Sequence, residues 1–277
     1  MKQKLFLDVA MEAIQKKELP LNEKRRRNLQ TSHFKVDEES RKALKRSKGD
    51  YFTITYTNNS LLKHSKSITK ELIHVLKTLL RQPKKDDKTL IIGLGNSSVL
   101  ADALGPKTTN KIIATNHFDD FLTIPKLALF VPEVIGKTGI SSYRLIEMLV
   151  ANLKPSTIIV IDSLATNSEC HLNNCIEVSD TGIIPGSALR TNKEISSKTF
   201  GIPVISIGIP LMLNINDSLY TSPDIADIID KSSDVISNAI NSIYLSWHAF
   251  YRVWRLLLRE KEFFDARTIP TWYYLIN

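Results

Sequence analysis

Two aspartates stand in loops framed by glycine or proline, each shortly after an apolar segment. Asp102 follows TLIIGLG and precedes Leu-Gly-Pro, and Asp180 follows NCIEV and precedes TGIIPG. Two carboxyl groups held close together cannot both ionise, so they share one proton. The ionised member can then take a proton from water while the protonated member polarises a carbonyl, which is chemistry that hydrolyses an amide. The sequence therefore predicts Asp102 and Asp180 as a catalytic pair, provided that the fold brings them together.

The tripeptide Asp180-Thr181-Gly182 is also found around the catalytic carboxylate of pepsin-like aspartic proteases. That fold is nearly all β and needs a second Asp-Thr/Ser-Gly lobe or a symmetric dimer, whereas this chain has no second copy and its Ile-rich runs alternate with helical segments. The tripeptide therefore does not indicate a pepsin-like protease. Gly182 and Gly186 relieve the steric limits on a backbone that bends tightly, and we expect Thr181 and Gly182 to support the site.

A glycine-containing segment, GLGNSS (Gly93–Ser98), follows a predicted strand. The third glycine of the dinucleotide-binding fingerprint is missing and no helix clearly starts there, so a Rossmann site is poorly supported. GLGN after a strand also occurs in peptidyl-tRNA hydrolases, but in that family it stands almost at the N-terminus and continues Pro-Gly. That alternative stays open, and Asn96 in this loop is a candidate supporting residue.

Short, nearly continuous apolar runs rich in Ile and Val predict the strands. Runs of this kind are typical of strands buried on both faces: TLIIGLG, KIIAT, LALFVP, STIIVID and PVISIG. DYFTITYT (Asp50–Thr57) alternates apolar and polar residues and predicts a half-buried strand. The expected fold class is α/β, with three layers in which helices cover both faces of a parallel or mixed sheet.

Helical spacing of apolar residues predicts the covering helices. It occurs over Ser65–Gln82, about Ser141–Leu153 and Ser222–Ile243. The last helix is expected to begin at a cap made by Ser222 with Pro223 and Asp224. The Leu-Gly-Pro after Asp102 predicts a turn.

Composition divides the chain into three parts. Residues 1–50 are polar and charge-dense, with one short helical pattern at Leu5–Ile14, and are expected to be an extension lying over the domain. Residues 51–245 are expected to form the α/β domain. Residues 246–277 are a tail with all three tryptophans and a basic helical pattern. Packing on the domain is the favoured interpretation of this tail, with oligomerisation or membrane-surface contact as alternatives.

The net charge is +8, and much of the excess lies before residue 50. Basic runs attract acidic partners or nucleic acid. We favour a solvated arm, for which contact with nucleic acid is possible but not required.

The longest apolar runs are far below the roughly 20 residues that cross a bilayer, so a soluble cytoplasmic protein is expected. Cys170, His171 and Cys175 do not match the usual zinc spacings, so we expect free thiols and no metal.

The sequence resembles the germination (spore) endopeptidase family. The family's motifs occur in order from about Thr89 to Pro210: IIGLGN..V..DALGPK, T.HF, TGI, KPSTIIVIDSLA, N..I.VSDTGIIPGS and TFGIPVISIGIP. Weaker likeness extends to FLDVAMEA (Phe6–Ala13), to DYFTIT and to the segment from Tyr220 to Leu245.

The resemblance implies an α/β domain similar to the hydrogenase-maturation proteases and phosphorylase/hydrolase-like folds. It also implies a metal-independent aspartate mechanism without a cofactor, a homotetramer, and cleavage of the small acid-soluble proteins that coat DNA in the cytoplasm (core) of dormant spores. The family aspartates taken as catalytic fall on Asp102 and Asp180. Asp162 in IDSLA matches a further family aspartate, for which we expect a supporting role because a carboxylate at a strand end is often a hydrogen-bond acceptor.

The chain also departs from the family pattern. The family is activated as a zymogen by removal of an N-terminal prosegment, and here about six residues precede the start that resembles the mature chain. The family loop GSGVGNKR is GSALRTNK (Gly186–Lys193). A non-catalytic relative that keeps the fold and binds spore proteins is therefore the second hypothesis, and a peptidyl-tRNA hydrolase-like enzyme is the third.

Overall fold

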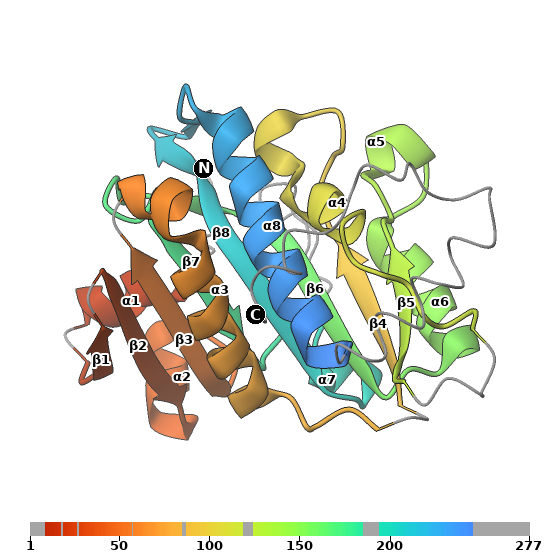
Figure 1. Ribbon diagram of the computed structural model, residues 1–277. Helices are drawn as coiled ribbons and strands as arrows, with labels where there is room; N and C mark the ends of the chain where they lie inside the picture. Colours follow the sequence, from red (N-terminus) through yellow and green to blue (C-terminus); the bar gives the residue numbers. More distant parts are fainter. Residues whose placement is uncertain are drawn as a thin grey trace.

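A mixed sheet runs through the computed structural model, which describes residues 9–17, 19–26, 28–56, 58–84, 87–118, 124–184 and 194–245 (Figure 1). Within these residues the strand order is β1-β2-β3-β7-β8-β6-β4-β5, and β9 pairs with β8. The strands are β1 (Asn22–Arg26), β2 (Leu29–Val36), β3 (Gly49–Tyr56), β4 (Lys88–Gly93), β5 (Lys126–Phe130), β6 (Thr157–Thr166), β7 (Cys175–Ser179), β8 (Val204–Ile215) and β9 (Ser218–Tyr220).

Helices cover both faces of this sheet (Figure 1). They are α1 (Ala10–Lys16), α2 (Glu38–Leu44), α3 (Asn58–Leu79), the 3₁₀ turn η1 (Leu100–Asp102), α4 (Leu104–Thr109), α5 (Ile135–Thr138), α6 (Ser142–Leu153), α7 (Ser197–Phe200) and α8 (Ile225–Tyr244). The α/β fold class predicted from the apolar runs is confirmed, and the sheet is mixed.

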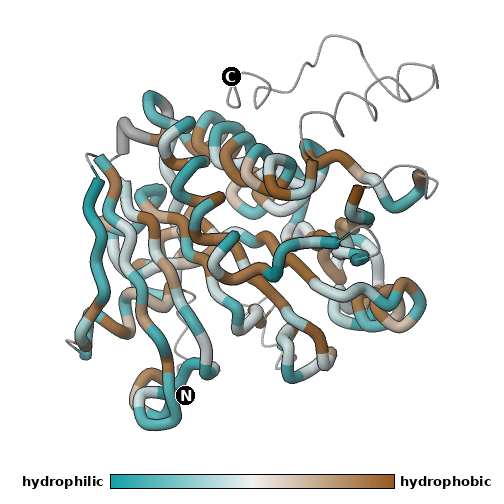
Figure 2. Tube along the Cα trace, turned by 60° about the horizontal axis from the view of Figure 1, so that its bottom comes forward, coloured by the Kyte–Doolittle hydropathy of each residue, from teal (hydrophilic) through white to brown (hydrophobic). Residues whose placement is uncertain are grey.

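The alternation of side chains along each strand divides the core into two layers. Ile159 and Ile161 of β6 pack in the cluster that contains the buried faces of α3, α4 and α8. Ile158 and Val160 pack in the opposite cluster, against α6 and the segment around α7. Hydrophobic residues accordingly concentrate along the inner strands and on the helix faces that meet them (Figure 2). This double burial explains why β4, β6 and β8 read as continuous apolar runs.

The strands of the sheet differ in direction on its two sides. β4 pairs in parallel with β5 and with β6, and β6 pairs in parallel with β8. β7, β3, β2 and β1 follow one another as antiparallel neighbours beyond β8. The carboxyl ends of β4, β5, β6 and β8 therefore meet at one edge of the sheet, whereas β7 ends at the level where β8 begins.

The described part of residues 1–50 belongs to the sheet, which differs from the expected extension over the domain. β1 and β2 form a hairpin that pairs with β3. In addition, the half-buried carboxylate of Glu177 accepts hydrogen bonds from the amides of Ala10 (2.7 Å) and Met11 (3.1 Å). A carboxylate at this position satisfies free amides at the start of α1. The polar composition of β1 reflects its position at an exposed edge, not separation from the domain.

One predicted strand is wrong. KIIAT (residues 111–115) follows α4 as turns and irregular backbone. Two of its backbone groups are satisfied by a side chain, because Asn241 of α8 accepts from the amide of Ile113 (3.1 Å) and donates to the carbonyl of Lys111 (3.1 Å). Ile112 is buried in the core without a strand partner. An apolar run of this length therefore does not distinguish a strand from a buried connection.

Two helix starts also differ from the sequence expectation. The Leu-Gly-Pro after Asp102 opens α4, where Pro106 in the first turn costs no intrahelical hydrogen bond. The final helix begins at Ile225, and its N-cap residue Asp224 makes no side-chain cap. Ser222 instead accepts the amide of Asp224 at 3.4 Å, in the turn that precedes the helix.

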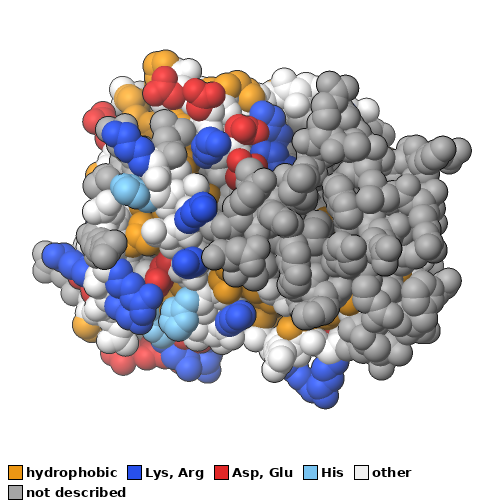
Figure 3. Space-filling view, viewed as in Figure 1, with side chains coloured by type: hydrophobic (Ala, Val, Ile, Leu, Met, Phe, Trp, Pro, Cys, Tyr) orange, Lys and Arg blue, Asp and Glu red, His pale blue; other side chains and the backbone are white. Residues whose placement is uncertain are grey.

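Lys and Arg side chains are prominent over the half of the molecule that holds α3 and the first strands (Figure 3). Exposed basic residues there include Lys24 and Arg25 of β1 and Lys70 and Lys77 of α3. Contact of this region with nucleic acid stays a prediction. Among the described residues, no helix combines the length and the apolar character that a membrane crossing requires.

The tail over residues 246–277 and the loop Gly186–Lys193 lie outside the described residues.

Candidate active site

The connections that follow β4 and β6 lead to opposite sides of the sheet, so the carboxyl ends of these two neighbouring strands are a topological switch point. The chain leaves β4 through α4 on one face of the sheet and reaches β5 on one side, and it leaves β6 toward β7 and β8 on the other side. In open α/β sheets such a switch point leaves a crevice at the carboxyl ends of the strands, which is the usual place for a ligand. Asp102 follows β4, and Asp162 lies in the second half of β6.

Asp102 is held by the loop that leaves β4. Its Oδ2 accepts the amide of Asn96 at 2.9 Å, and Asn96 Oδ1 accepts the amide of Ser98 at 3.0 Å, which closes a tight turn. Gly95 has φ +118°, and a Cβ there would lie 1.9 Å from the carbonyl oxygen of Asp102. Only glycine therefore permits this approach. Asn96, predicted as a supporting residue, contacts Asp102 through its backbone and shapes the turn through its side chain.

The environment of Asp102 favours its protonated form. Burial raises the pKa of Asp102 to about 6, the hydrogen bond from Asn96 opposes the rise, and the negative charge of Glu133 adds to it. A carboxyl group with a pKa in this range can exchange a proton near neutral pH, as an acid or base in hydrolysis requires.

Asp162 lies beside this loop. Its Cα partner on β8 is Gly208, and its Oδ1 accepts the amide of Ser163 at 2.9 Å. The carbonyl of the preceding residue, Ile161, accepts the amide of Leu94 at 2.8 Å, so the β4 loop is hydrogen-bonded directly to β6. η1, which ends at Asp102, also contacts β6. The turn that ends at Asp102 and the strand that carries Asp162 are thus neighbours.

Asp180 occupies a different part of the sheet. It follows β7, and Ser179 pairs with Ser206 near the start of β8, whereas Asp162 is level with Gly208. Three inter-strand steps separate β7 from β4, and at about 4.8 Å each they amount to about 14 Å. Within one chain, the strand register therefore does not bring Asp180 to Asp102.

Asp180 contacts the segment at the start of β3. Its Oδ1 accepts the amide of Asp50 at 2.8 Å and thereby joins the end of β7 to the start of β3. A Cβ on Gly49 would lie 2.3 Å from the same oxygen, so the two segments are in close contact. Burial raises the pKa of Asp180, the hydrogen bond from Asp50 opposes this rise, and the charge of Asp50 adds to it.

Thr181 and Gly182 fix the segment after Asp180. The Thr181 hydroxyl lies 2.9 Å from that of Ser179, which lies 2.8 Å from that of Ser206. Gly182 has φ +84°, and a Cβ there would lie 2.0 Å from the carbonyl oxygen of Ile195. The Asp-Thr-Gly bend therefore brings the chain against Ile195, and its two last residues contribute to the wall of a pocket.

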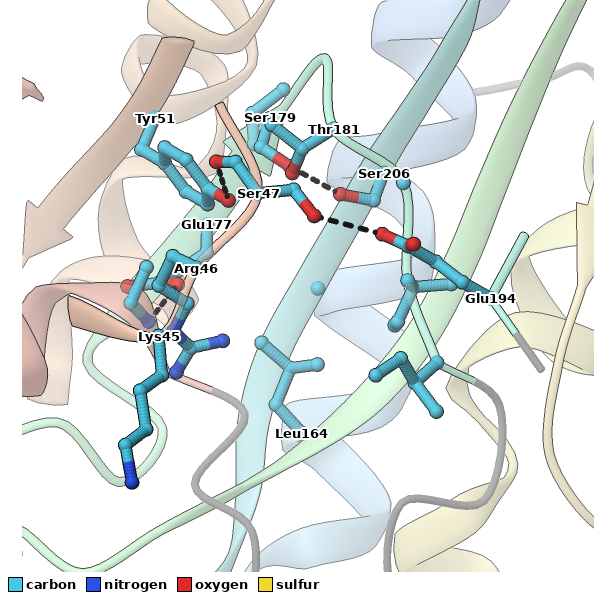
Figure 4. Close-up of a pocket in the computed structure, with 16 residues that line it drawn as sticks. Lys45, Arg46, Ser47, Tyr51, Leu164, Glu177, Ser179, Thr181, Glu194 and Ser206 are labelled. Atoms are coloured by element: carbon cyan, nitrogen blue, oxygen red, sulfur yellow. Dashed lines mark hydrogen bonds between the residues drawn. The ribbon is translucent and has the colours of Figure 1, made fainter. Parts of the chain in front are cut away.

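This pocket of about 120 Å³ lies against β6 and β8, with Leu164 on its wall (Figure 4). Leu164 lines it and shares a face of β6 with Asp162, and Gly208, the strand partner of Asp162, lines it too. Figure 4 shows the labelled polar residues around it, with Ser47 Oγ donating to Glu194 Oε1 at 3.0 Å. The other charged lining residues are Lys45, Arg46 and Glu177.

No local sequence pattern predicts the pocket, because its walls come from separate parts of the chain. Arg46, Glu177 and Glu194 come from segments far apart in the chain and meet only through the pairing of β3, β7 and β8. The position of Asp162 directly after the run STIIVI was a usable signal, since β6 continues there beyond the last residue of its parallel neighbour β4, and ligands bind at that edge of such sheets.

The cysteines agree with the sequence expectation, because Cys170 and Cys175 are both free thiols. Across the part of the chain that the structure describes, no group of three or more His, Cys, Asp or Glu side chains is placed to hold a metal ion.

A family model for germination protease matches residues 4–242. The chain belongs to the germination protease family. Two curated germination proteases illustrate the similarity. The one from Geobacillus sp. (strain WCH70) is 36% identical over 219 residues, which cover 73% of this chain and 57% of the relative. The one from Priestia megaterium is 35% identical over 227 residues, which cover 76% of this chain and 59% of the relative.

The germination protease from Caldanaerobacter subterraneus subsp. tengcongensis is 33% identical over 224 residues, covering 75% of this chain and 68% of that relative. The chain thus spans between 57% and 68% of the length of these three family members. The resemblance inferred from the motifs is confirmed, and the family match does not favour a peptidyl-tRNA hydrolase.

A solved structure, the [NiFe] hydrogenase maturation protease HycI from Thermococcus kodakarensis KOD1, matches with a TM-score of 0.36 and 16% sequence identity. The match covers 62% of this chain and 99% of that one. At this score it carries no further conclusion.

Proposed function

We propose that this germination protease family member is an endopeptidase in which Asp102 and Asp162 form the catalytic pair. The observation that supports the proposal is the contact of η1, which ends at Asp102, with β6, the strand that carries Asp162. This replaces the pairing of Asp102 with Asp180, for which we propose a structural role at the junction of β7 and β3.

The two carboxyl groups take different parts in the reaction. Asp102, with its pKa raised to about 6, holds the shared proton and donates a hydrogen bond to the carbonyl oxygen of the scissile peptide. Asp162 accepts a proton from the attacking water. When the tetrahedral intermediate collapses, Asp162 passes the proton it took from water to the leaving amine. The pair thereby returns to its starting state. The titration belongs to the pair, because the proton is shared.

The pocket beside Asp162 receives a substrate side chain next to the scissile bond. It lies on the face of the sheet to which Asp162 belongs, and its hydroxyl groups and charged residues offer both donors and acceptors. An extended polypeptide that enters the crevice can therefore place its carbonyl at the carboxylates and a neighbouring side chain in the pocket.

Family membership supports a role in spore germination, with small acid-soluble spore proteins as the substrates and the spore core as the location. A homotetramer, zymogen activation and nucleic acid contact through the basic N-terminal region belong to the same proposal.

The test is cleavage of a purified small acid-soluble spore protein by the full chain and by D102N. The wild-type protein is expected to release discrete fragments, and D102N is expected to lose at least about a thousandfold in kcat/KM while it keeps the wild-type circular dichroism spectrum. Binding of the substrate without cleavage at any pH would instead identify a non-catalytic relative.

A further inference from the structure

Glu133 occupies an uncommon backbone conformation close to the candidate active site. It follows β5 and has φ +58°, in the left-handed region that a residue with a side chain seldom adopts. Its carbonyl oxygen accepts the hydroxyl of Ser142 at 2.7 Å, which fixes the segment to the start of α6. An uncommon conformation that neighbouring contacts maintain is a reason to look for a role of the side chain.

The side chain of Glu133 reaches the loop that supports Asp102. Its Oε2 accepts the amide of Ser97 at 3.2 Å, and Lys137 Nζ lies 3.2 Å from the same oxygen and 2.7 Å from Ser97 Oγ. Ser97 directly follows Asn96, whose amide donates to Asp102 Oδ2. The adjacent residues Ser97 and Asn96 are therefore hydrogen-bonded through their amides to Glu133 and to Asp102 respectively.

We propose that Glu133 is a positioning residue for Asp102, which it serves by fixing the Asn96–Ser97 turn and by directing a negative charge toward the Asp102 carboxyl group. The inference rests on the proposed function. Glu133 touches no substrate in this account and acts through the turn.

The charge of Glu133 contributes to the raised pKa of Asp102, after burial. The charged residues on the other elements that contact η1 are Asp162 on β6, Lys107 on α4, and Asp227, Asp230, Lys231 and Asp234 on α8, and β8 has none. Asp230 and Asp234 each lie 2.8 Å from Lys111, so those two carboxylates are paired away from Asp102.

Three variants separate the charge of Glu133 from its hydrogen bond. E133Q removes the charge and keeps an oxygen that accepts the Ser97 amide. E133G removes both, and glycine suits φ +58°, so the backbone is not penalised. K137M keeps Glu133 and removes the cation that partly neutralises it.

The readout is the titration of the Asp102 carboxyl carbon by NMR in the full-length protein, assigned with D102N, together with the pH profile of kcat. E133Q is expected to shift the Asp102 titration to lower pH, and K137M is expected to shift it to higher pH. E133G is expected to shift it like E133Q and to lower kcat on the order of tenfold with little change in KM, because the turn under Asp102 loses its support. E133Q is expected to retain more of kcat than E133G.

An Asp102 titration that stays unchanged in both E133Q and K137M would overturn the inference, as would an E133G protein with wild-type kcat. The NMR titration needs no turnover, so it decides the role of the Glu133 charge even if the wild-type protein cleaves no substrate. If the wild-type protein cleaves its substrate but substitution of Glu133 leaves the Asp102 titration unchanged, the role of Glu133 is refuted and the proposed function stands.

Discussion

The amide of Leu94 donates a hydrogen bond of 2.8 Å to the carbonyl of Ile161. Leu94 is the first residue after β4, and Ile161 directly precedes Asp162 on β6. This bond continues the pairing of the two strands beyond Gly93, so the loop that carries Asp102 leaves the sheet beside Asp162. The proposed catalytic pair depends on this junction.

Replacement of Asp102 by Asn is expected to stabilise the fold at neutral pH. The pKa of Asp102 rises from 3.8 to about 6 on folding, so between these values the folded state binds more protons than the unfolded state. Stability therefore falls as the pH rises through this interval, and the loss persists above it. The full shift corresponds to about 3 kcal/mol, which partial exposure reduces to about 1 to 2 kcal/mol.

Urea denaturation of wild-type protein and D102N measures this effect. D102N is expected to gain free energy of unfolding at about pH 7 and to gain nothing at about pH 3.5, where Asp102 is neutral in both states. An equal gain at the two pH values would show that the ionisation of Asp102 is not its cause.

Gly182 is expected to tolerate substitution far less than Gly201. Both have positive φ, +84° and +71°, but a Cβ on Gly182 would lie 2.0 Å from the carbonyl oxygen of Ile195, whereas nothing lies within 4 Å of the corresponding position on Gly201. G201A should cost about 1 kcal/mol from backbone strain alone. G182A should cost about 3 kcal/mol or more, because the bridge between Ile183 and Ile195 must also move.

Chemical denaturation of the two alanine variants provides the comparison, with G201A as the control for backbone strain. Equal losses of unfolding free energy in both would contradict the close approach at Gly182.

Glu177 is expected to anchor α1 to the sheet. E177A would leave the amides of Ala10 and Met11 without their acceptor, and the hydroxyl of Thr53, at 3.3 Å, would lose the same partner. The expected cost is about 2 to 4 kcal/mol. E177Q should cost less, because its amide oxygen still accepts.

Hydrogen exchange at Ala10 and Met11 reports this contact directly. Exchange should be fastest in E177A, intermediate in E177Q and slowest in the wild-type protein, and unchanged protection in E177A would refute the anchoring role.

The sequence predicted the elements that are buried by their own composition. The runs around Ile91, Ile159 and Ile205 became the central strands β4, β6 and β8, since a strand buried on both faces has to be apolar at every position. The helical spacing over Ser222–Ile243 gave α8 for the same reason, with its start displaced to Ile225.

The parts that could not be predicted depend on partners distant in the chain. β1 is polar because it lies at an edge, and its identity as a strand comes from pairing with β2. Likewise, both Asp162 and Asp180 follow apolar segments, and local sequence does not reveal that β6 is parallel to β4 while β7 is antiparallel to β8. Strand order and strand direction together place Asp162, and not Asp180, on a neighbour of β4.

The most direct test of the account compares kcat/KM for D162N and D180N in one assay on a small acid-soluble spore protein. We predict that D162N loses at least about a thousandfold, as expected for a group that acts on the reacting water, whereas D180N loses no more than about tenfold and chiefly lowers stability. A D180N protein as inactive as D102N, beside a D162N protein with near wild-type activity, would contradict the assignment of the catalytic pair.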